Sequence, residues 1–353
     1  NDVISLYKYG IKENPWDDIE REKLENNKIK DRIKGQDVAV EKSISIIKRA
    51  KTGFSGLQHS SASKPKGILF FAGPTGTGKT ELAKAIAELL FGDESACRRF
   101  DMSEYSESHS AQKLFGAPPG YVGYEAGGQL TNTIKEHPFS LLLFDEVEKA
   151  SPTIWDKFLQ ILEDGRMTDG QGNTVYFSEC LIVFTSNLGI YQDVGGVKKR
   201  VVDMNMSYNE LNKVVTKGIQ DYFFSKGKPE VLNRIGKNLI VFNFIQPDAA
   251  KEILLSQINK ICKAIYSMKK ISIKFGNDAV KEKLYKKVLT NLEEGGRGVG
   301  NIVEEYFTTP LSTYVFDNRV ENGQTITIED ITGLNSEESE LEMPRIIASL
   351  ERI

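Results

Sequence analysis

A glycine-rich segment between an apolar run and a helical stretch constrains the fold of this chain more than any other feature. Residues 73–80 read GPTGTGKT, which fits the pattern GxxxxGKS/T, and they follow the apolar run 67–72. Glycines let backbone amides wrap phosphates, and the start of a helix adds a partial positive charge. The sequence therefore predicts a phosphate-binding loop between a strand and a helix.

The residues of this loop have separate expected roles. Lys79 is placed to reach the β- and γ-phosphates of ATP, and the Thr80 hydroxyl is placed to bind Mg²⁺. The candidate nucleotide-binding residues are Gly73, Pro74, Thr75, Gly76, Thr77, Gly78, Lys79, Thr80 and Glu81.

Two further apolar runs end in polar residues that suit phosphate chemistry. One reads LLLFDE and ends in Asp145 and Glu146, and the other is followed by Asn187. Asp145 can hold Mg²⁺ through its water shell, and Glu146 can polarise the water that attacks the γ-phosphate. The Asn187 amide can orient the same water, although alone it reads as a turn residue or helix cap. The candidate catalytic residues are thus Lys79, Glu146 and Asn187, and the candidate metal ligands are Thr80 and Asp145.

The apolar runs alternate with helical stretches. Runs 67–72, 140–144 and 180–184 are apolar throughout, as strands buried on both faces are, and 81–91 reads as a helix. This alternation predicts an α/β fold with a parallel sheet covered on both sides. Ligands of such sheets bind beyond the carboxyl ends of the strands, where the three polar endings fall.

After about Phe244 the pattern becomes that of a smaller, mostly helical domain. Helices are expected over 247–267, 277–289 and 300–314, and short strands over 271–275 and 325–328.

The two ends of the chain carry weaker patterns. The first thirty residues are polar with little to bury, and they read as a linker that ends in a charged helix over 17–30. The last residues are acid-rich and weakly patterned, and their pattern gives no firm indication of structure. The expected divisions are a linker and helix (1–30), an α/β domain (31–245), a small helical domain (246–333) and a tail (334–353).

Composition excludes several classes of function. The net charge of −3 gives no overall attraction to nucleic acid, and no apolar run approaches the roughly 20 residues that span a bilayer. Three scattered cysteines and three scattered histidines match no metal-ligand spacing, and the cysteines favour a reducing, cytoplasmic compartment. Because the chain begins at Asn1 and not at Met, we expect either that its start has been removed or that it is a piece of a longer protein.

Several motifs together resemble the Clp family of AAA+ protein unfoldases, and most of all the second ATPase module of ClpB- and ClpA-type members. The resemblance implies an AAA+ P-loop domain with a small helical domain, and a homo-oligomeric, hexameric ring. It covers about 10–328, and besides 73–80 it rests on residues 100–105 (FDMSEY), 116–124 (GAPPGYVGY), 127–131 (GGQLT), 145–149 (DEVEK) and 162–172 (LEDGRMTDGQG).

The resemblance implies three further nucleotide contacts. Arg234, in the segment PEVLNRI, matches an arginine that reaches the ATP of the neighbouring subunit, where its forked donor meets the γ-phosphate. Without the family, Arg234 reads as a surface salt-bridge partner. Arg297 matches an arginine that senses phosphate within the same subunit. Ile33 matches a contact to adenine, although Lys34 stands beside it where the family has an apolar residue.

The resemblance also implies a polypeptide substrate. Tyr121 and Val122, in the segment GYVG, match a loop that grips an extended polypeptide in the ring's pore. An aromatic ring contacts any side chain, and the glycines let the loop move. The alternative is that Tyr121 and Tyr124 are packing residues. Residues 169–172 (DGQG) predict a hairpin tip, which is either a second pore loop or an ordinary turn.

Two departures from the family limit its implications. Gly298, Gly300 and Asn301 replace the proline and basic residues that follow the sensing arginine, and residues 190–213 lack the tripeptide that docks a peptidase ring. No peptidase partner is therefore expected. The linker around Gly10 resembles one that joins an upstream domain.

The expected function is a ring-forming ATPase that couples hydrolysis to threading, unfolding or remodelling of polypeptide. The alternative is an ATP-controlled assembly or signalling module in a larger defence or regulatory protein, in which no chain is threaded. A DNA-acting motor would need basic pore loops, and Tyr121 stands against it.

Overall fold

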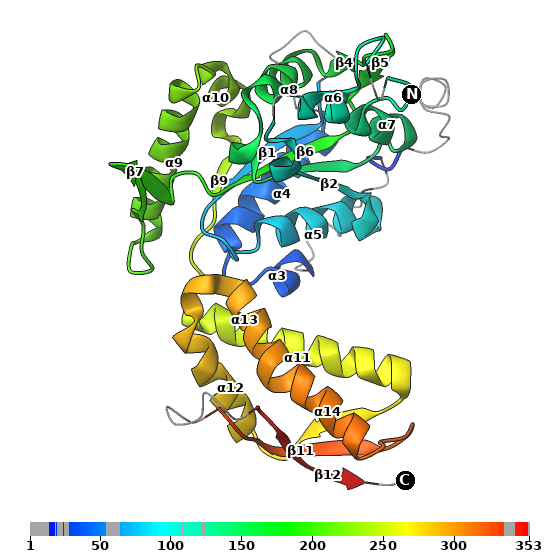
Figure 1. The fold of residues 1–353 in the computed structure, drawn as a ribbon, viewed down its shortest axis with the longest axis vertical. Helices are drawn as coiled ribbons and strands as arrows, with labels where there is room; N and C mark the ends of the chain where they lie inside the picture. The colour runs from blue at the N-terminus through cyan, green and yellow to red at the C-terminus, as the bar shows by residue number, and fades with distance from the viewer. Residues whose placement is uncertain are drawn as a thin grey trace. The chain divides into compact units, whose positions relative to one another are not determined.

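The apolar run before the glycine-rich loop forms a strand inside a five-stranded parallel sheet (Figure 1). The strand order is β2-β3-β6-β1-β9, and every neighbouring pair is parallel, which confirms the predicted α/β fold. The strands are β1 (Gly67–Ala72), β2 (Cys97–Asp101), β3 (Leu141–Asp145), β6 (Leu181–Ser186) and β9 (Leu239–Val241).

This computed structural model describes residues 14–17, 19, 24, 28–53, 64–107, 109–121, 124–334 and 343–351. The chain divides into two compact units. Unit 1 holds Asn1–Pro74 and Gly78–Asn243, and unit 2 holds Thr75–Thr77 and Phe244–Ile353. Among the described residues, no helix is both long enough and apolar enough to cross a bilayer.

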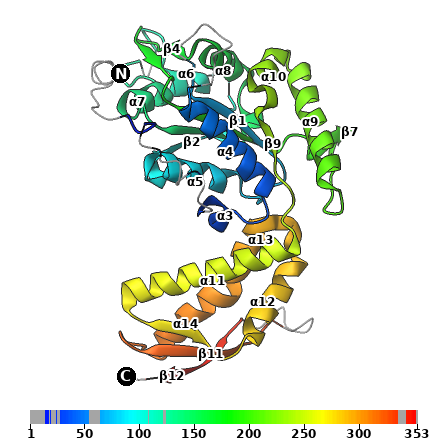
Figure 2. The same ribbon diagram turned by 180° about the vertical axis from the view of Figure 1, so that it is seen from behind.

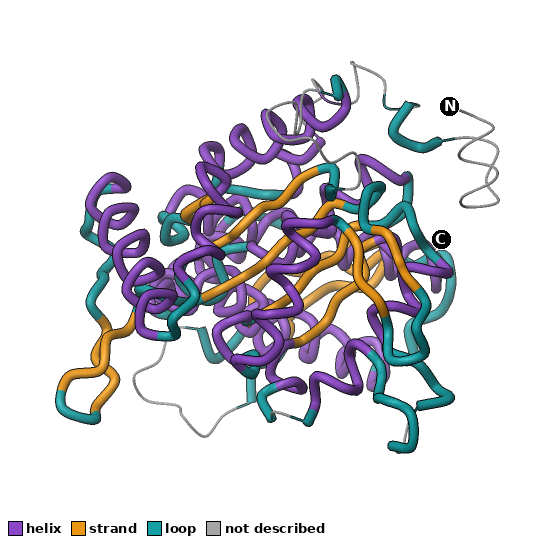
Figure 3. Tube along the Cα trace, turned by 90° about the horizontal axis from the view of Figure 1, so that it is seen from above, coloured by secondary structure: helices purple, strands orange, loops and turns teal. Residues whose placement is uncertain are grey.

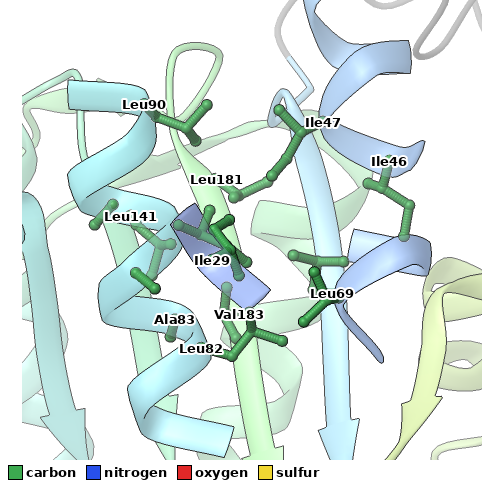
Figure 4. Close-up of a cluster of buried hydrophobic side chains, with 14 of the residues drawn as sticks. Ile29, Ile46, Ile47, Leu69, Leu82, Ala83, Leu90, Leu141, Leu181 and Val183 are labelled. Atoms are coloured by element: carbon green, nitrogen blue, oxygen red, sulfur yellow. The ribbon is translucent and has the colours of Figure 1, made fainter. Parts of the chain in front are cut away.

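One face of the sheet in unit 1 is covered by α4 (Asp37–Lys51) and α5 (Lys79–Phe91), as the view in Figure 2 shows. Alternate strand residues such as Leu69, Leu141 and Leu181 point into this layer, because successive side chains of a strand face opposite sides. They pack with Ile47, Leu82 and Ile29 of α3 (Lys28–Arg32), as Figure 4 shows.

The opposite face carries an aromatic cluster. Phe144 and Phe184, on neighbouring strands, stack with ring centroids 5.4 Å apart. Trp155 and Phe158 of α8 (Pro152–Asp164) pack onto them, with Phe144 and Phe158 separated by 4.6 Å. Figure 3 shows the strands of the sheet running between the two layers of helices. The other helices of unit 1 are α6 (Ser110–Phe115), α7 (Gln129–Glu136), α9 (Tyr208–Ser225) and α10 (Pro229–Ile235).

Two hairpins extend unit 1. β4 (Arg166–Thr168) pairs with β5 (Thr174–Tyr176), so the tip predicted at 169–172 does join two antiparallel strands. β7 (Tyr191–Val194) pairs with β8 (Val197–Arg200). No secondary structure was proposed from the sequence for the surrounding segment, residues 190–213.

Unit 2 packs helices against a three-stranded sheet of order β10-β11-β12. Its core includes Leu254, Leu284, Phe307 and Ile326, all fully buried. The elements are α11 (Pro247–Lys269), β10 (Ser272–Phe275), α12 (Ala279–Thr290), α13 (Gly295–Val303), a π-helical stretch (Glu304–Thr308), α14 (Thr309–Asp317), β11 (Thr325–Ile331) and β12 (Ile346–Glu351).

One helix of unit 2 begins earlier than predicted. The helix expected from residue 300 begins at Gly295, in a stretch whose glycines do not indicate a helix, and a Cβ on Gly298 would lie 2.7 Å from the Asn291 carbonyl oxygen. No structure was predicted for the tail, and there β12 pairs antiparallel with β11 and buries Ile346.

The expectation that residues 1–30 have little to bury was also wrong. Trp16, Ile19 and Leu24 are buried in the core of unit 1. The Trp16 indole N–H donates to the Glu179 carbonyl oxygen at 2.9 Å, so this amphipathic ring satisfies its polar atom while it packs. Residues 18, 20–23 and 25–27 of the predicted charged helix lie outside the described residues.

Neighbouring phenylalanines on α9 give a matched test of this packing. Phe223 is fully buried with its ring 4.8 Å from that of Trp155, whereas Phe224 is 64% exposed. We predict that Phe223→Ala lowers the free energy of unfolding by about 3–5 kcal/mol, because it leaves a cavity. Phe224→Ala should change it by less than about 0.5 kcal/mol. Urea denaturation followed by circular dichroism measures both, and equal losses would contradict the assigned core.

Candidate functional site

The register of the parallel sheet brings the predicted polar residues to one edge. Ala72 pairs with Ser186, and Asp101 pairs with Asp145, so these strands end at the same level. The glycine-rich loop, Glu146 and Asn187 follow directly from those ends. Three sequence segments that are far apart in the chain therefore meet at the carboxyl edge of the sheet, as predicted.

The loop backbone takes a conformation that requires glycine. Gly73 and Gly78 have φ of +146° and +96°, which side-chain-bearing residues rarely adopt. A Cβ on Gly73 would also lie 2.7 Å from the Phe242 carbonyl oxygen. Gly78 directly precedes the first residue of α5, so the loop delivers the chain to a helix N-terminus.

Lys79 is buried, and its ammonium group lies inside the loop. Its Nζ donates to the carbonyl oxygens of Gly73 at 2.6 Å and Pro74 at 2.8 Å, and to Asn187 Oδ1 at 2.9 Å. A buried cation needs such acceptors, because desolvation without them costs several kcal/mol. The structure thus brings Lys79 and Asn187 into direct contact.

Asp145 lies at the centre of a second set of contacts. The Thr80 hydroxyl is 3.4 Å from Asp145 Oδ2, and the Thr185 hydroxyl donates to Oδ1. Arg99 Nε donates to Oδ2 at 2.8 Å, from the neighbouring strand β2. Asp145 is 7% exposed, so the two predicted metal ligands lie side by side in a nearly buried, oxygen-rich position.

Glu146 has an unusual backbone. Its φ of +54° is one of three positive values among the described non-glycine residues, and such strain often marks functional positions. Its N–H donates to the Thr185 hydroxyl at 3.0 Å, and its carboxylate pairs with Lys149. This hydrogen bond to Glu146 raises the pKa of Lys149.

Glu148 also contributes hydrogen bonds at this edge of the sheet. Its Oε1 accepts from the Asn187 backbone N–H at 3.0 Å, and its carbonyl oxygen accepts from the Tyr222 hydroxyl at 3.3 Å. The segment after β3 is thereby tied to the segment after β6 and to α9.

The segment that resembles the adenine contact is fixed to the end of the sheet. Gln36 is buried and exchanges two hydrogen bonds with the Asn243 backbone, at 2.9 and 3.0 Å. Ile33 is buried in the layer under α4 and α5. Glu81 pairs with Arg32 at 2.6 Å. Burial alone would lower the pKa of Arg32, but hydrogen bonds to Glu81 and Glu94 raise it.

The other predicted residues that the structure describes are exposed or partly exposed. Arg234, on α10, pairs with Glu163 at 2.5 Å on the partly exposed surface of unit 1. Tyr121 is 62% exposed, and Val122 lies outside the described residues. Arg297 is an exposed residue of α13 in unit 2, the unit that also holds Thr75, Gly76 and Thr77.

Sequence reasoning missed three of the supporting residues. Arg99 precedes Asp101 by two positions in β2, and such spacing places both on one face of a strand. Thr185 lies in the polar ending that drew attention only to Asn187, and Glu148 lies within the motif 145–149. Their signals were present in the sequence, but only the strand register shows which side chains they meet.

The fold and the edge cluster define a P-loop ATPase domain of the AAA type. The family model described as AAA domain (Cdc48 subfamily) matches residues 64–238.

Whole-chain similarity extends beyond this domain. The chain is 38% identical over 301 residues to chaperone protein ClpB of Bdellovibrio bacteriovorus, covering 85% of this chain and 33% of that protein. It is 37% identical over 335 residues to chaperone protein ClpB 2 of a Nostoc species, covering 93% and 36%. The chain belongs to the Clp family of AAA+ ATPases. It spans about a third of the length of these relatives.

The Thr185 hydroxyl bonds to both acidic residues of the site, so its removal tests both contacts at once. We predict that Thr185→Val, which keeps the shape, lowers the free energy of unfolding by about 1–3 kcal/mol, because Asp145 loses a donor and the Glu146 N–H loses its acceptor. Thr174→Val, at an exposed position of β5, is the matched control. Chemical denaturation compares them. Equal stability of the two variants would contradict a structural role for the hydroxyl.

Proposed function

We propose that this chain hydrolyses ATP at the carboxyl edge of the unit 1 sheet. The observation that carries the proposal is the meeting of Lys79, Asn187, Thr80 and Asp145 at the ends of three adjacent parallel strands. An ammonium group, an amide and a carboxylate beside a glycine-rich helix start are the groups that phosphoryl transfer requires for positioning and charge neutralisation.

The residues present fit a nucleotide with Mg²⁺. Gly78 is the N-cap of α5 and no side chain caps this helix, so its start offers backbone amides of the kind that bind anions. Oxygen ligands suit Mg²⁺, and Thr80 and Asp145 offer a hydroxyl and a carboxylate 3.4 Å apart. The metal would neutralise phosphate charge. Ile33 and Gln36 lie on the segment proposed to meet the base.

Two residues are proposed to act on the attacking water. The Thr185 hydroxyl holds Glu146 in its strained backbone conformation. The Glu146 carboxylate accepts a hydrogen bond from the attacking water and so polarises it. The Asn187 side-chain amide orients the same molecule, and Glu148 fixes the Asn187 backbone by accepting from its N–H. Lys149 holds the Glu146 carboxylate in this structure, and its exposed position lets that pair open.

Arg234 is proposed to complete the site of a neighbouring copy in a hexameric ring. Its side chain is 35% exposed and pairs with the side chain of Glu163, which is 41% exposed, a contact worth only about 0–1 kcal/mol at a surface. The arginine can therefore exchange this partner for a phosphate at little cost. Arg297, exposed on α13, is proposed to sense the phosphate within its own subunit.

The substrate is proposed to be an unfolded polypeptide drawn through the ring by Tyr121. This ring is among the largest exposed apolar side chains of unit 1, and it follows Gly120, whose φ is +86°. An exposed aromatic on a glycine-containing loop suits contact without sequence preference. The relatives are named chaperones, which agrees with action on polypeptides. Val122 is part of this proposal because it follows Tyr121 in the segment GYVG.

Mixing two inactive variants tests the shared site. We predict that Glu146→Gln and Arg234→Ala each lower ATP hydrolysis at least 100-fold while nucleotide binding remains, because each removes a group that acts in the transition state. Mixed rings should regain hydrolysis, since some interfaces then contain an intact Glu146 and an intact Arg234. Phosphate release measures the rate. If Arg234→Ala alone hydrolysed ATP normally in assembled form, the shared site would be refuted.

Substitution of Tyr121 separates threading from a nucleotide-controlled switch. We predict that Tyr121→Ala keeps ATP hydrolysis within about twofold, because it lies outside the phosphate site, and loses unfolding of a tagged fluorescent protein. Tyr191→Ala, at a tyrosine 54% exposed on β7, is the matched control. Unfolding by both variants at the parent rate would instead support an ATP-controlled assembly module.

A further inference from the structure

The tip of the β4–β5 hairpin is packed against the loop that carries Tyr121. We define the hairpin tip as residues 169–173, and the Tyr121 loop as residues 116–121 and 124–128. A Cβ on Gly170 would lie 2.1 Å from the Ala117 carbonyl oxygen, and one on Gly116 would lie 3.2 Å from the Gly170 backbone nitrogen. The two backbones thus touch with no room for a side chain between them.

A glutamine at the hairpin tip reaches the other side of the same loop. Gln171 Nε2 donates to the carbonyl oxygens of Tyr124 at 2.9 Å and Glu125 at 3.3 Å. These carbonyls lie three and four positions after Tyr121. The hairpin tip therefore holds the Tyr121 loop before and after the exposed aromatic ring.

The hairpin tip is itself held by a buried carboxylate. Asp169, whose side chain is 0% exposed, accepts from the backbone N–H groups of Gln171 at 3.0 Å and Asn173 at 2.8 Å. Lys135 Nζ donates to it at 2.7 Å from α7, the helix that follows the Tyr121 loop. Burial alone would raise the pKa of Asp169, but the hydrogen bonds from Lys135 and Asn173 lower it, so the carboxylate stays charged.

The base of the hairpin is part of the core of unit 1. Met167 and Val175 are buried, and β4 follows α8 through Gly165. α8 begins six positions after Glu146 and packs its aromatic residues on the sheet. The hairpin is thus a short rigid extension of the element that leads away from the nucleotide site.

We propose that the β4–β5 hairpin is a brace that fixes the Tyr121 loop, with Gln171 as its positioning residue. The side-chain polar groups of Asp169 and Gln171 bond to the protein itself, as a positioning role requires. The assignment of polypeptide contact to the loop rests on the proposed function, whereas the brace itself is a property of unit 1.

Hydrogen exchange in the peptide that spans residues 117–128 tests the brace without any polypeptide substrate. This stretch contains the turn amides of Tyr121, Tyr124 and Gly127, which donate within the loop at 3.2–3.3 Å. We predict that Gln171→Met speeds their exchange about fivefold, the value of one net hydrogen bond, in the full 353-residue chain. The peptide at the start of α5 should exchange as in the parent.

Two further variants control for folding and for size. Gln192→Met on β7 replaces another exposed glutamine of a hairpin and should leave the loop unchanged. Gln171→Lys restores a donor and should return exchange toward the parent value. Because Gln171 is exposed, the midpoint of thermal unfolding should move by no more than a few degrees.

The polypeptide readout separates the brace from the proposed function. With a carboxymethylated, unfolded protein as probe, Gln171→Met should raise the KM for stimulation of ATP hydrolysis several-fold and leave the basal rate unchanged. Unchanged loop exchange in Gln171→Met overturns the brace, whatever the probe shows. Faster exchange, together with full unfolding activity of Tyr121→Ala, supports the brace and refutes the threading proposal instead.

Discussion

The buried ammonium group of Lys79 is the charge on which the architecture of unit 1 depends. Its three acceptors come from the end of β1 and the segment after β6, so those strands must lie side by side and run in the same direction. The ion pair between the Asp145 carboxylate on β3 and Arg99 on β2 likewise holds these two strands side by side. Desolvated charges are costly unless paired, and here the parallel order of the strands brings the partners together.

Much of the first unit could be predicted from the sequence, because its signals are local. The run before the glycine-rich loop, and the runs that end in Asp145 and near Asn187, have the uninterrupted apolar character that only a doubly covered strand needs. β2 and β9 were missed for the opposite reason. β2 contains Arg98 and Arg99 and is therefore not an apolar run, and β9 is apolar but has only three residues.

What the sequence could not show is which distant groups meet. Nothing near Thr185 indicates that its hydroxyl serves Asp145 and Glu146 at once, and nothing near Gln36 indicates Asn243 as its partner. Such contacts depend on register and crossovers, which are not periodic. β12, near the C-terminus, was not predicted for a similar reason. Its residues differ in burial only because the strand pairs with β11, which lies earlier in the chain.

The close approach of the two loop backbones in unit 1 also bears on how the molecule can be altered. A Cβ on Gly116, Gly128 or Gly170 would come too close to main-chain atoms, so these three positions require glycine. Tyr121 projects outward with no such restriction. The exposed side chain of the Tyr121 loop can therefore be exchanged by substitution at one position, whereas the three glycines that fit the loop against the hairpin cannot be replaced.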